Sequence, residues 1–90
     1  MPIRPSDGPI DRARYFFDIH DGAHQRDDAG TECADQQGAA LEAKRLLSAI
    51  AVDEVPKDAE RQTITVVVTD EEGHAVYSAA LTFVGTWLLR

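Results

Sequence analysis

The stretch Asp35–Val55, DQQGAALEAKRLLSAIAVDEV, is the one segment of this sequence with the pattern of a long amphipathic helix. Its apolar residues recur at steps of three and four, which places them on one face of a helix with 3.6 residues per turn. They are Ala39, Ala43, Leu46, Leu47 and Ile50. Asp35 has the carboxylate typical of an N-cap, and Pro56 disfavours a helical conformation at Val55. We therefore predict a helix from Asp35 to Val55, about 30 Å long, that packs its apolar face on the core. The alternative is that this alanine-rich face binds a partner.

The segment before the helix predicts two strands joined by a turn. Arg14–His20 alternates so that Tyr15, Phe17 and Ile19 share one face. Three of the six aromatic residues lie in this strand, so we expect it inside the sheet and under the helix. Asp21-Gly22 favours a turn, after which Ala23–Asp27 returns as a polar edge strand. A second turn at 28–31 and a short lead at 32–34 then reach the helix.

The segment after the helix predicts a β-hairpin. The run Gln62–Thr69 is rich in β-branched residues, and Ile64, Val66 and Val68 share one of its faces. Asp70–Gly73 is the hairpin loop, and His74–Val84 is the last strand. One side of that strand carries five residues: Ala75, Tyr77, Ala79, Leu81 and Phe83. The order is β-β-α-β-β, which is the α+β class, with one antiparallel sheet and one helix packed on it. Residues 1–13 are expected to form a flexible leader, either native or a start-site extension, and residues 14–90 a single domain.

Composition limits the partners that we expect. The net charge is −7, and the nine basic residues form no run, so we expect no nucleic acid and no anionic membrane surface as a partner. Cys33 is the sole cysteine, so no disulfide forms within the chain, and a small packed residue is favoured over a reactive thiol. The sequence shows neither the apolar core of a signal peptide nor a run of eighteen apolar residues. These features together favour a reducing cytoplasm.

A family resemblance rests on two motifs. The first is Arg14-Tyr15-Phe16-Phe17-Asp18-Ile19-His20-Asp21-Gly22, and the second is Asp27-Asp28-Ala29-Gly30-Thr31-Glu32. They resemble a family of short bacterial proteins classed as a domain of unknown function, over about residues 14–84. Such proteins open with this aromatic strand and continue with an Asp-x-x-Gly-x-Glu turn, an alanine-rich helix and a hairpin with an acidic Gly turn. The resemblance implies no activity, cofactor or catalytic residue.

A looser resemblance is to small antitoxins whose partial double-stranded-RNA-binding-like domain places strands before an amphipathic helix. The approach to the helix from Gly30 to Asp35 is similar to theirs, whereas their Pro-Gly-Cys stretch is lacking. This likeness is one of architecture.

The densest polar cluster before the helix contains the candidate metal ligands Asp18, His20 and His24. Imidazoles and carboxylates at close spacing ligate divalent metals. On a strand, Asp18 and His20 point to the same side, and a returning second strand brings His24 toward them. The alternative is a hairpin of solvated polar residues, and we expect neither a metal nor another cofactor. The acids Asp70, Glu71 and Glu72 are interpreted as a solvated hairpin tip.

No nucleophile motif or phosphate loop occurs, and a domain this small has little room for a substrate cavity, so we predict no enzyme and no catalytic residue.

Trp87, Leu88 and Leu89 either pack back on the domain or form an interface with another chain. The leading hypothesis is a protein that acts through protein contacts, as a homodimer or an adaptor. The alternatives are a small metal- or ligand-binding domain and an antitoxin-like regulator of a basic protein.

Overall fold

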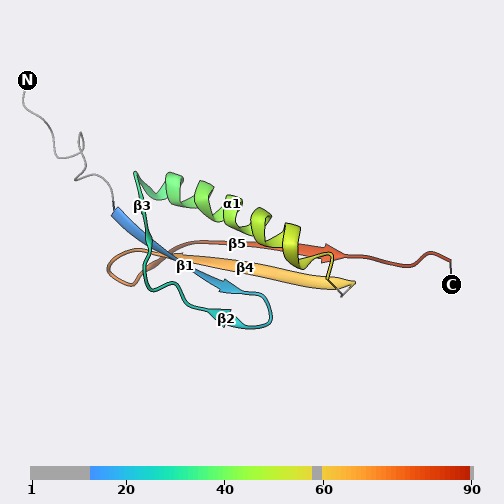
Figure 1. Cartoon of the computed structure of the whole chain (residues 1–90). Coiled ribbons are helices and arrows are strands. Elements are labelled where there is room, and N and C mark those ends of the chain that lie inside the picture. The colour runs from blue at the N-terminus through green and yellow to red at the C-terminus, as the bar shows by residue number, and fades with distance from the viewer. Residues whose placement is uncertain (1–12, 58–59, 90) are drawn as a thin grey trace, which may run out of the picture.

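The computed structural model describes residues 13–57 and 60–89 and shows one helix lying across one face of an antiparallel sheet (Figure 1). The order is β-β-β-α-β-β, which confirms the predicted α+β class and adds one strand. The elements are β1 (Ala13–His20), β2 (His24–Gln25), β3 (Thr31–Cys33), α1 (Gln36–Glu54), β4 (Arg61–Thr69) and β5 (Ala75–Val84). The expected leader lies outside the described residues except for Ala13, which begins β1.

Helix α1 has the predicted limits. Asp35 is its N-cap, and the Asp35 carboxylate accepts a hydrogen bond from the Gly38 amide at 2.7 Å. Val55, just before Pro56, is the C-cap. The predicted apolar face is the packed face: three of its residues are buried, and the other two are partly buried against the core. No helix in the described part of the chain is long and apolar enough to span a bilayer.

The sheet has the strand order β2-β1-β4-β5, and β3 also pairs with β1. The order follows from two facts. The Asp21-Gly22 turn pairs β2 with the end of β1. β4 pairs antiparallel with the opposite edge of β1, from Phe16↔Thr69 to His20↔Thr65. β1 is therefore inside the sheet, as its aromatic content predicted, and β5 lies at the far end of the order.

The core lies between α1 and the sheet. Its largest buried side chains come from β1 and β4 in the predicted alternation, and the buried apolar residues of the two strands are Tyr15, Phe17, Ile19, Ile64, Val66 and Val68. Cys33 is buried beside them, as predicted for a packed residue. The opposite face of the sheet carries Phe16, Asp18, Thr65 and Val67, which are half-buried. This face has no covering layer among the described elements (Figure 1).

Three details differ from the predicted elements. The lead into the helix, 31–33, forms β3 by pairing with the start of β1, as in Tyr15↔Thr31. The second strand, predicted over 23–27, is limited to His24–Gln25, because Asp27 makes side-chain hydrogen bonds in place of a strand ladder. A bulge lies at the start of β5: Thr69 pairs with Ala75, whereas Val68 pairs with Tyr77. The prediction that Ala75 shares a face with Tyr77 is therefore wrong, because the extra residue in the bulge shifts the alternation.

Candidate functional site

Strand β5 presents its outer edge to solvent. It lies at the end of the strand order, and no described strand pairs with that edge. From Ala75 to Leu89 the sequence contains no charged residue, no histidine and no proline. Natural proteins usually protect such edges with charges, prolines or bulges, because an unpaired edge is a template for another strand. The β5 edge has one of these protective features, the bulge at its start. Beyond Tyr77 the strand is regular.

The segment after β5, residues 85–89, continues away from the body of the domain (Figure 1). Its base is held by the Gly85 amide, which donates a hydrogen bond to the Glu60 carbonyl at 2.6 Å. A Cβ on Gly85 would displace the Glu60 carboxylate and press on the Phe83 ring, so glycine fits closely at this point. We call residues 85–89 the C-terminal segment.

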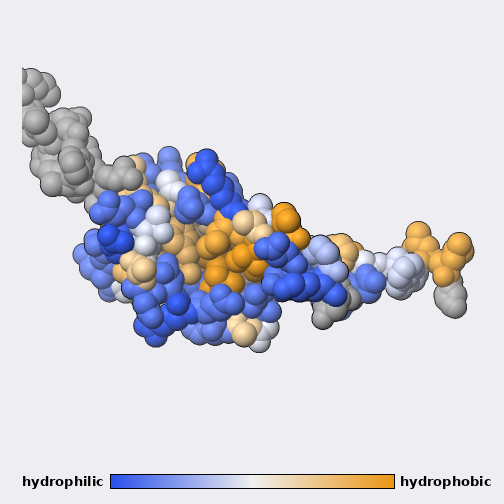
Figure 2. Space-filling model, viewed as in Figure 1, coloured by the Kyte–Doolittle hydropathy of each residue, from blue (hydrophilic) through white to orange (hydrophobic). Residues whose placement is uncertain are grey.

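The three large apolar side chains of the C-terminal segment do not pack back on the domain. Trp87, Leu88 and Leu89 are 81%, 88% and 92% exposed, and Figure 2 shows hydrophobic side chains at the far end of the segment. Of the two placements considered from the sequence, packing on the chain's own core is therefore the wrong one. Exposed apolar side chains of this size, gathered at one place, are typical of contact surfaces.

A groove runs beside the same edge, between α1 and β5. It encloses about 310 Å³, and its floor and walls include Leu47, Tyr77, Ala79 and Leu81. Leu81 and the neighbouring Phe83 are 42% and 37% exposed, so this part of β5 is only partly covered by the helix. Lys44 and Ser48 of α1 also line the groove. The edge, the groove and the C-terminal segment thus bring apolar side chains of the last fifteen described residues together with one side of α1.

The predicted metal candidates lie on the β1–β2 hairpin. The Asp18 Oδ2 atom is 3.8 Å from His24 Nε2, and the His20 and His24 rings stack with centroids 4.2 Å apart. His20 and His24 are exposed. The hairpin therefore brings the three side chains together in pairs. The stacked rings lie nearly parallel, with planes 8° apart, so their faces are turned toward each other.

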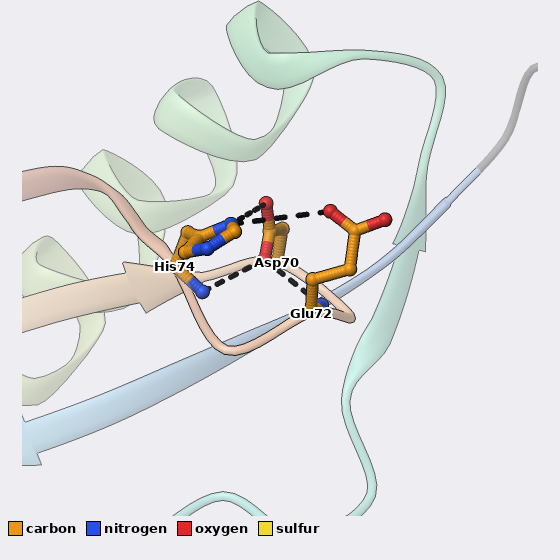
Figure 3. Close-up of side chains that lie close together, drawn as sticks. All are labelled: Asp70, Glu72 and His74. Carbon is orange, nitrogen blue, oxygen red and sulfur yellow. Dashed lines mark hydrogen bonds and ion pairs between the residues drawn. The ribbon is translucent and has the colours of Figure 1, made fainter.

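A second group lies at the β4–β5 turn, and there three ligand atoms lie within 4.8 Å of one another in Asp70, Glu72 and His74 (Figure 3). The Asp70 Oδ1 atom already accepts hydrogen bonds from the amides of His74 and Glu72, both at 2.9 Å. The hydrogen bond from the His74 amide is the main reason that the pKa of Asp70 lies below its usual value. Since the carboxylate is engaged in closing the turn, and Glu72 and His74 are exposed, the group is explained as the hairpin tip that the sequence predicted.

The two motifs of the family resemblance form one hydrogen-bonded unit. The Asp27 carboxylate accepts from the amides of Phe17, Ala29 and Gly30 at 3.0–3.1 Å, and the Asp27 amide donates to Asp18 Oδ1 at 3.0 Å. Partial burial alone would raise the pKa of Asp27, but the three backbone hydrogen bonds outweigh that effect and lower it. The Asp27 carboxylate thereby gives the Phe17 amide a hydrogen-bond acceptor at the part of the β1 edge that lies between β2 and β3.

The remaining motif residues secure the same turn. Gly30 has φ of +75°, and a Cβ there would lie 2.6 Å from Arg14 Cγ and 2.9 Å from the Phe16 ring. The Arg14 guanidinium donates to the Ala29 carbonyl at 3.0 Å and lies 3.7 Å from the Glu32 carboxylate. The hydrogen bonds of the motif residues therefore hold this turn against β1.

The sequence predicted the hairpin tip as solvated, and Glu71 and Glu72 are exposed. It also named the C-terminal segment as an interface candidate, which stays a prediction. The residue patterns missed the bracing role of Asp27, because its partner amide belongs to Phe17, ten positions earlier. The uncharged run 75–89 does not by itself indicate an edge strand, because natural edge strands usually carry charges or prolines, and only the strand order shows that β5 is the edge.

These features define a class: a small single-domain α+β protein with a half-covered antiparallel sheet and an exposed apolar edge. The chain belongs to the family described as Domain of unknown function (DUF6894), whose model matches residues 14–82. No curated protein matches the chain, and no solved structure does so either. The matched region begins at Arg14, the first residue of the opening motif, and ends within β5.

Proposed function

We propose that this protein is a non-enzymatic protein that acts through protein–protein contacts, made by the outer edge of β5 and the C-terminal segment. The observation that carries the proposal is that Trp87, Leu88 and Leu89 are at least 81% exposed at the end of an uncharged edge strand. Removing such side chains from water is worth about 1.5–3 kcal/mol each, so a partner that covers them gains binding energy.

The rest of the molecule supports contact over catalysis. Among the described residues no charged side chain is buried, and the two aspartates whose pKa values are lowered, Asp27 and Asp70, owe this to hydrogen bonds from backbone amides that hold turns together. The acidic surface, with a net charge of −7, disfavours nonspecific association away from the apolar edge. We place these contacts in the cytoplasm, on the ground of the single cysteine and the overall composition.

The test is a chain that ends after Gly85, compared with the full chain by sedimentation and by affinity capture from a lysate of the cells that make it. We expect the truncated chain to keep its circular dichroism and melting temperature, because the removed side chains make no core contact. We expect it to lose its self-association or a stoichiometric partner. Equal assembly and equal capture by the two chains would overturn the proposal.

A matched control removes exposed apolar area elsewhere. Leu41 and Val52 lie on α1 and are 48% and 73% exposed. The double variant Leu41→Ser/Val52→Ser reduces the apolar surface without touching the β5 edge. Assembly of this variant should equal that of the full chain. If it falls as far as in the truncated chain, the contact is a general effect of apolar surface and the β5 edge has no special role.

The second candidate function is binding of a divalent metal at Asp18, His20 and His24. The observation that favours it is the proximity of Asp18 to His24 and of His24 to His20 on one hairpin. The double variant His20→Ala/His24→Ala tests it. A rise in melting temperature with zinc, manganese or nickel that the variant loses would support the site, and equal behaviour of the two proteins would remove it.

A further inference from the structure

We propose that the partner of the β5 edge is a second copy of this chain, whose β5 pairs antiparallel with the first across a two-fold axis beside Thr82. The inference rests on the proposed function, because it uses the same edge and the same C-terminal segment. The result is one continuous sheet through both copies, with the order β2-β1-β4-β5 in each half.

The position of the axis follows from the side chains along the edge. A two-fold axis perpendicular to the sheet places one residue opposite its own copy, and every other pair then joins positions equally far from it. The regular part of the edge begins after the bulge, at Tyr77. Pairing centred on Thr82 sets Tyr77 opposite Trp87 of the second copy, so the whole stretch 77–87 is matched.

On the face away from the helix this pairing matches like with like. Thr82 lies opposite Thr82, Ser78 opposite Thr86, and Ala80 opposite Val84. Cross-strand hydroxyl pairs and apolar pairs both stabilise a sheet. The structure already contains one such hydroxyl pair, since Thr82 Oγ1 lies 3.2 Å from Thr63 Oγ1 on β4. The new pairing extends this row of hydroxyl groups across the axis.

On the helix side the matches are apolar throughout. Leu81 lies opposite Phe83, Ala79 opposite Gly85, and Tyr77 opposite Trp87. Side chains alternate along an extended strand, so Gly85 and Trp87 continue the face of Leu81 and Phe83. Trp87 of one copy thus reaches the groove between α1 and β5 of the other, which Tyr77 and Ala79 line. The small pair Ala79 and Gly85 leaves the groove open for it.

In the neighbouring registers hydroxyl side chains no longer lie opposite hydroxyl side chains. Centring the axis on Leu81 sets Val84 opposite Ser78 and Thr86 opposite Val76. Centring it on Phe83 sets Val84 opposite Thr82 and Leu88 opposite Ser78. Each shift pairs a hydroxyl with an aliphatic side chain on the outer face, which gives up the cross-strand hydrogen bonds. The centre at Thr82 is therefore the register in which the segment is complementary to itself, and this argues for a second copy as the partner.

The matched stretch 77–87 brings apolar side chains of both copies into the contact. The two Trp87 rings contribute on the order of 300 Å² at roughly 150 Å² each, and the other side chains of residues 77–86 in both paired strands add to this. Specific interfaces bury about 1,200–2,000 Å² in total. The uncharged run 75–89 brings no like charges together at the axis, although the chain as a whole carries a net charge of −7.

The experiment is sedimentation equilibrium of the full chain and two variants. Thr82→Lys puts two ammonium groups opposite each other at the axis, while in one copy alone residue 82 is exposed and the substitution removes only the exposed hydroxyl contact with Thr63. We expect its dimer to weaken by about tenfold or more, because two like charges brought together at an interface repel each other strongly. Gln25→Lys is the matched control: it adds the same charge to exposed β2, at the other side of the sheet. We expect the control to dimerise as the original chain does.

The register is read by cross-linking with a short bis-maleimide. Thr82→Cys alone should link to its own copy, whereas Ala80→Cys and Val84→Cys should each link poorly alone and efficiently when mixed. Links of Ala80→Cys to itself would overturn the register.

The outcomes separate the two proposals. A dimer that is lost on truncation after Gly85 but unaffected by Thr82→Lys would overturn β5 pairing and keep the proposed contact surface. A chain that stays monomeric at about 100 μM, far above a typical stable dimer's dissociation constant, would overturn the self-association. In that case capture of another protein, lost on truncation, would still uphold the proposed function.

Discussion

Asp18 and Asp27 fasten two segments of the chain to each other: the Asp27 amide donates to the Asp18 carboxylate at 3.0 Å, and the Asp27 carboxylate accepts from the amide of Phe17, the neighbour of Asp18, at 3.1 Å. The exchange closes the β1 edge where neither β2 nor β3 reaches it. Both aspartates belong to the motifs on which the family resemblance rests, so these hydrogen bonds give the two motifs a structural role.

Removing the Asp27 carboxylate should destabilise the fold. Asp27→Ala leaves the Phe17, Ala29 and Gly30 amides without their acceptor, and we expect the free energy of unfolding to fall by about 1–3 kcal/mol. Urea unfolding measures the change. The control is Asp28→Ala, because the Asp28 side chain is exposed and approaches Arg26 only to 4.0 Å. A loss as large in the control as in Asp27→Ala would mean that the hydrogen bonds to the Asp27 carboxylate are not the cause.

The same carboxylate predicts an acid-sensitive stability. The folded state holds the pKa of Asp27 below 3.8, so between the two values the unfolded chain binds more protons. The stabilising contribution is present in full above pH 3.8 and is lost as the pH falls through the folded pKa. Urea unfolding from pH 6 down to pH 2.5, roughly the range in which carboxyl groups titrate, should therefore show a shallower acid loss in Asp27→Asn than in the original chain.

Asp70 adds to the acid sensitivity that Asp27 causes. Its pKa is also lowered, chiefly by the hydrogen bond from the His74 amide, so it too stabilises the fold at higher pH. The double variant Asp27→Asn/Asp70→Asn should lose still less stability on acidification than the single variant. Parallel acid curves for all three proteins would show that other carboxyl groups control the loss.

Gly30 and Gly73 form a matched pair for testing close packing. Both have positive φ, +75° and +88°, but a Cβ at Gly73 meets nothing within 4 Å, whereas one at Gly30 meets Arg14 and Phe16. Gly73→Ala should cost about 1–2 kcal/mol for the left-handed backbone alone. Gly30→Ala should cost more, by about 1–3 kcal/mol for overpacking. Equal melting temperatures of the two variants would show that the space around Gly30 adjusts.

Trp87 is the one tryptophan and reports on its own burial. It is 81% exposed in the isolated chain, so its fluorescence in dilute solution should peak at the wavelength of a solvated indole. Raising the concentration of the original chain should shift the emission to shorter wavelength as the groove of a second copy covers the ring. Thr82→Lys should keep the solvated spectrum at concentrations where the original chain has shifted. An emission maximum that does not depend on concentration would speak against burial on association.

The sequence by itself determined the local elements. The step of three and four in Ala39, Ala43 and Leu47 determined the packed face of α1, and the alternation in Ile64, Val66 and Val68 determined that of β4. These patterns are short in range, because helix and strand periods are set by backbone geometry within a few residues. For Trp87 the sequence left two alternatives open, packing on the chain's own core or exposure for contact with another chain.

The tertiary structure alone decided which segments meet. β1 and β4 pair in the sheet although α1 lies between them in the sequence, and this pairing leaves β5 at the edge. The bulge at Val76 arises from the register between β4 and β5, and Asp27 acts on Phe17 because the turn at Gly30 folds back over Arg14. Such relations depend on chain reversals and on packing of distant residues, which no local period encodes. For the same reason the edge of β5 and its self-complementary register became visible only in the folded sheet.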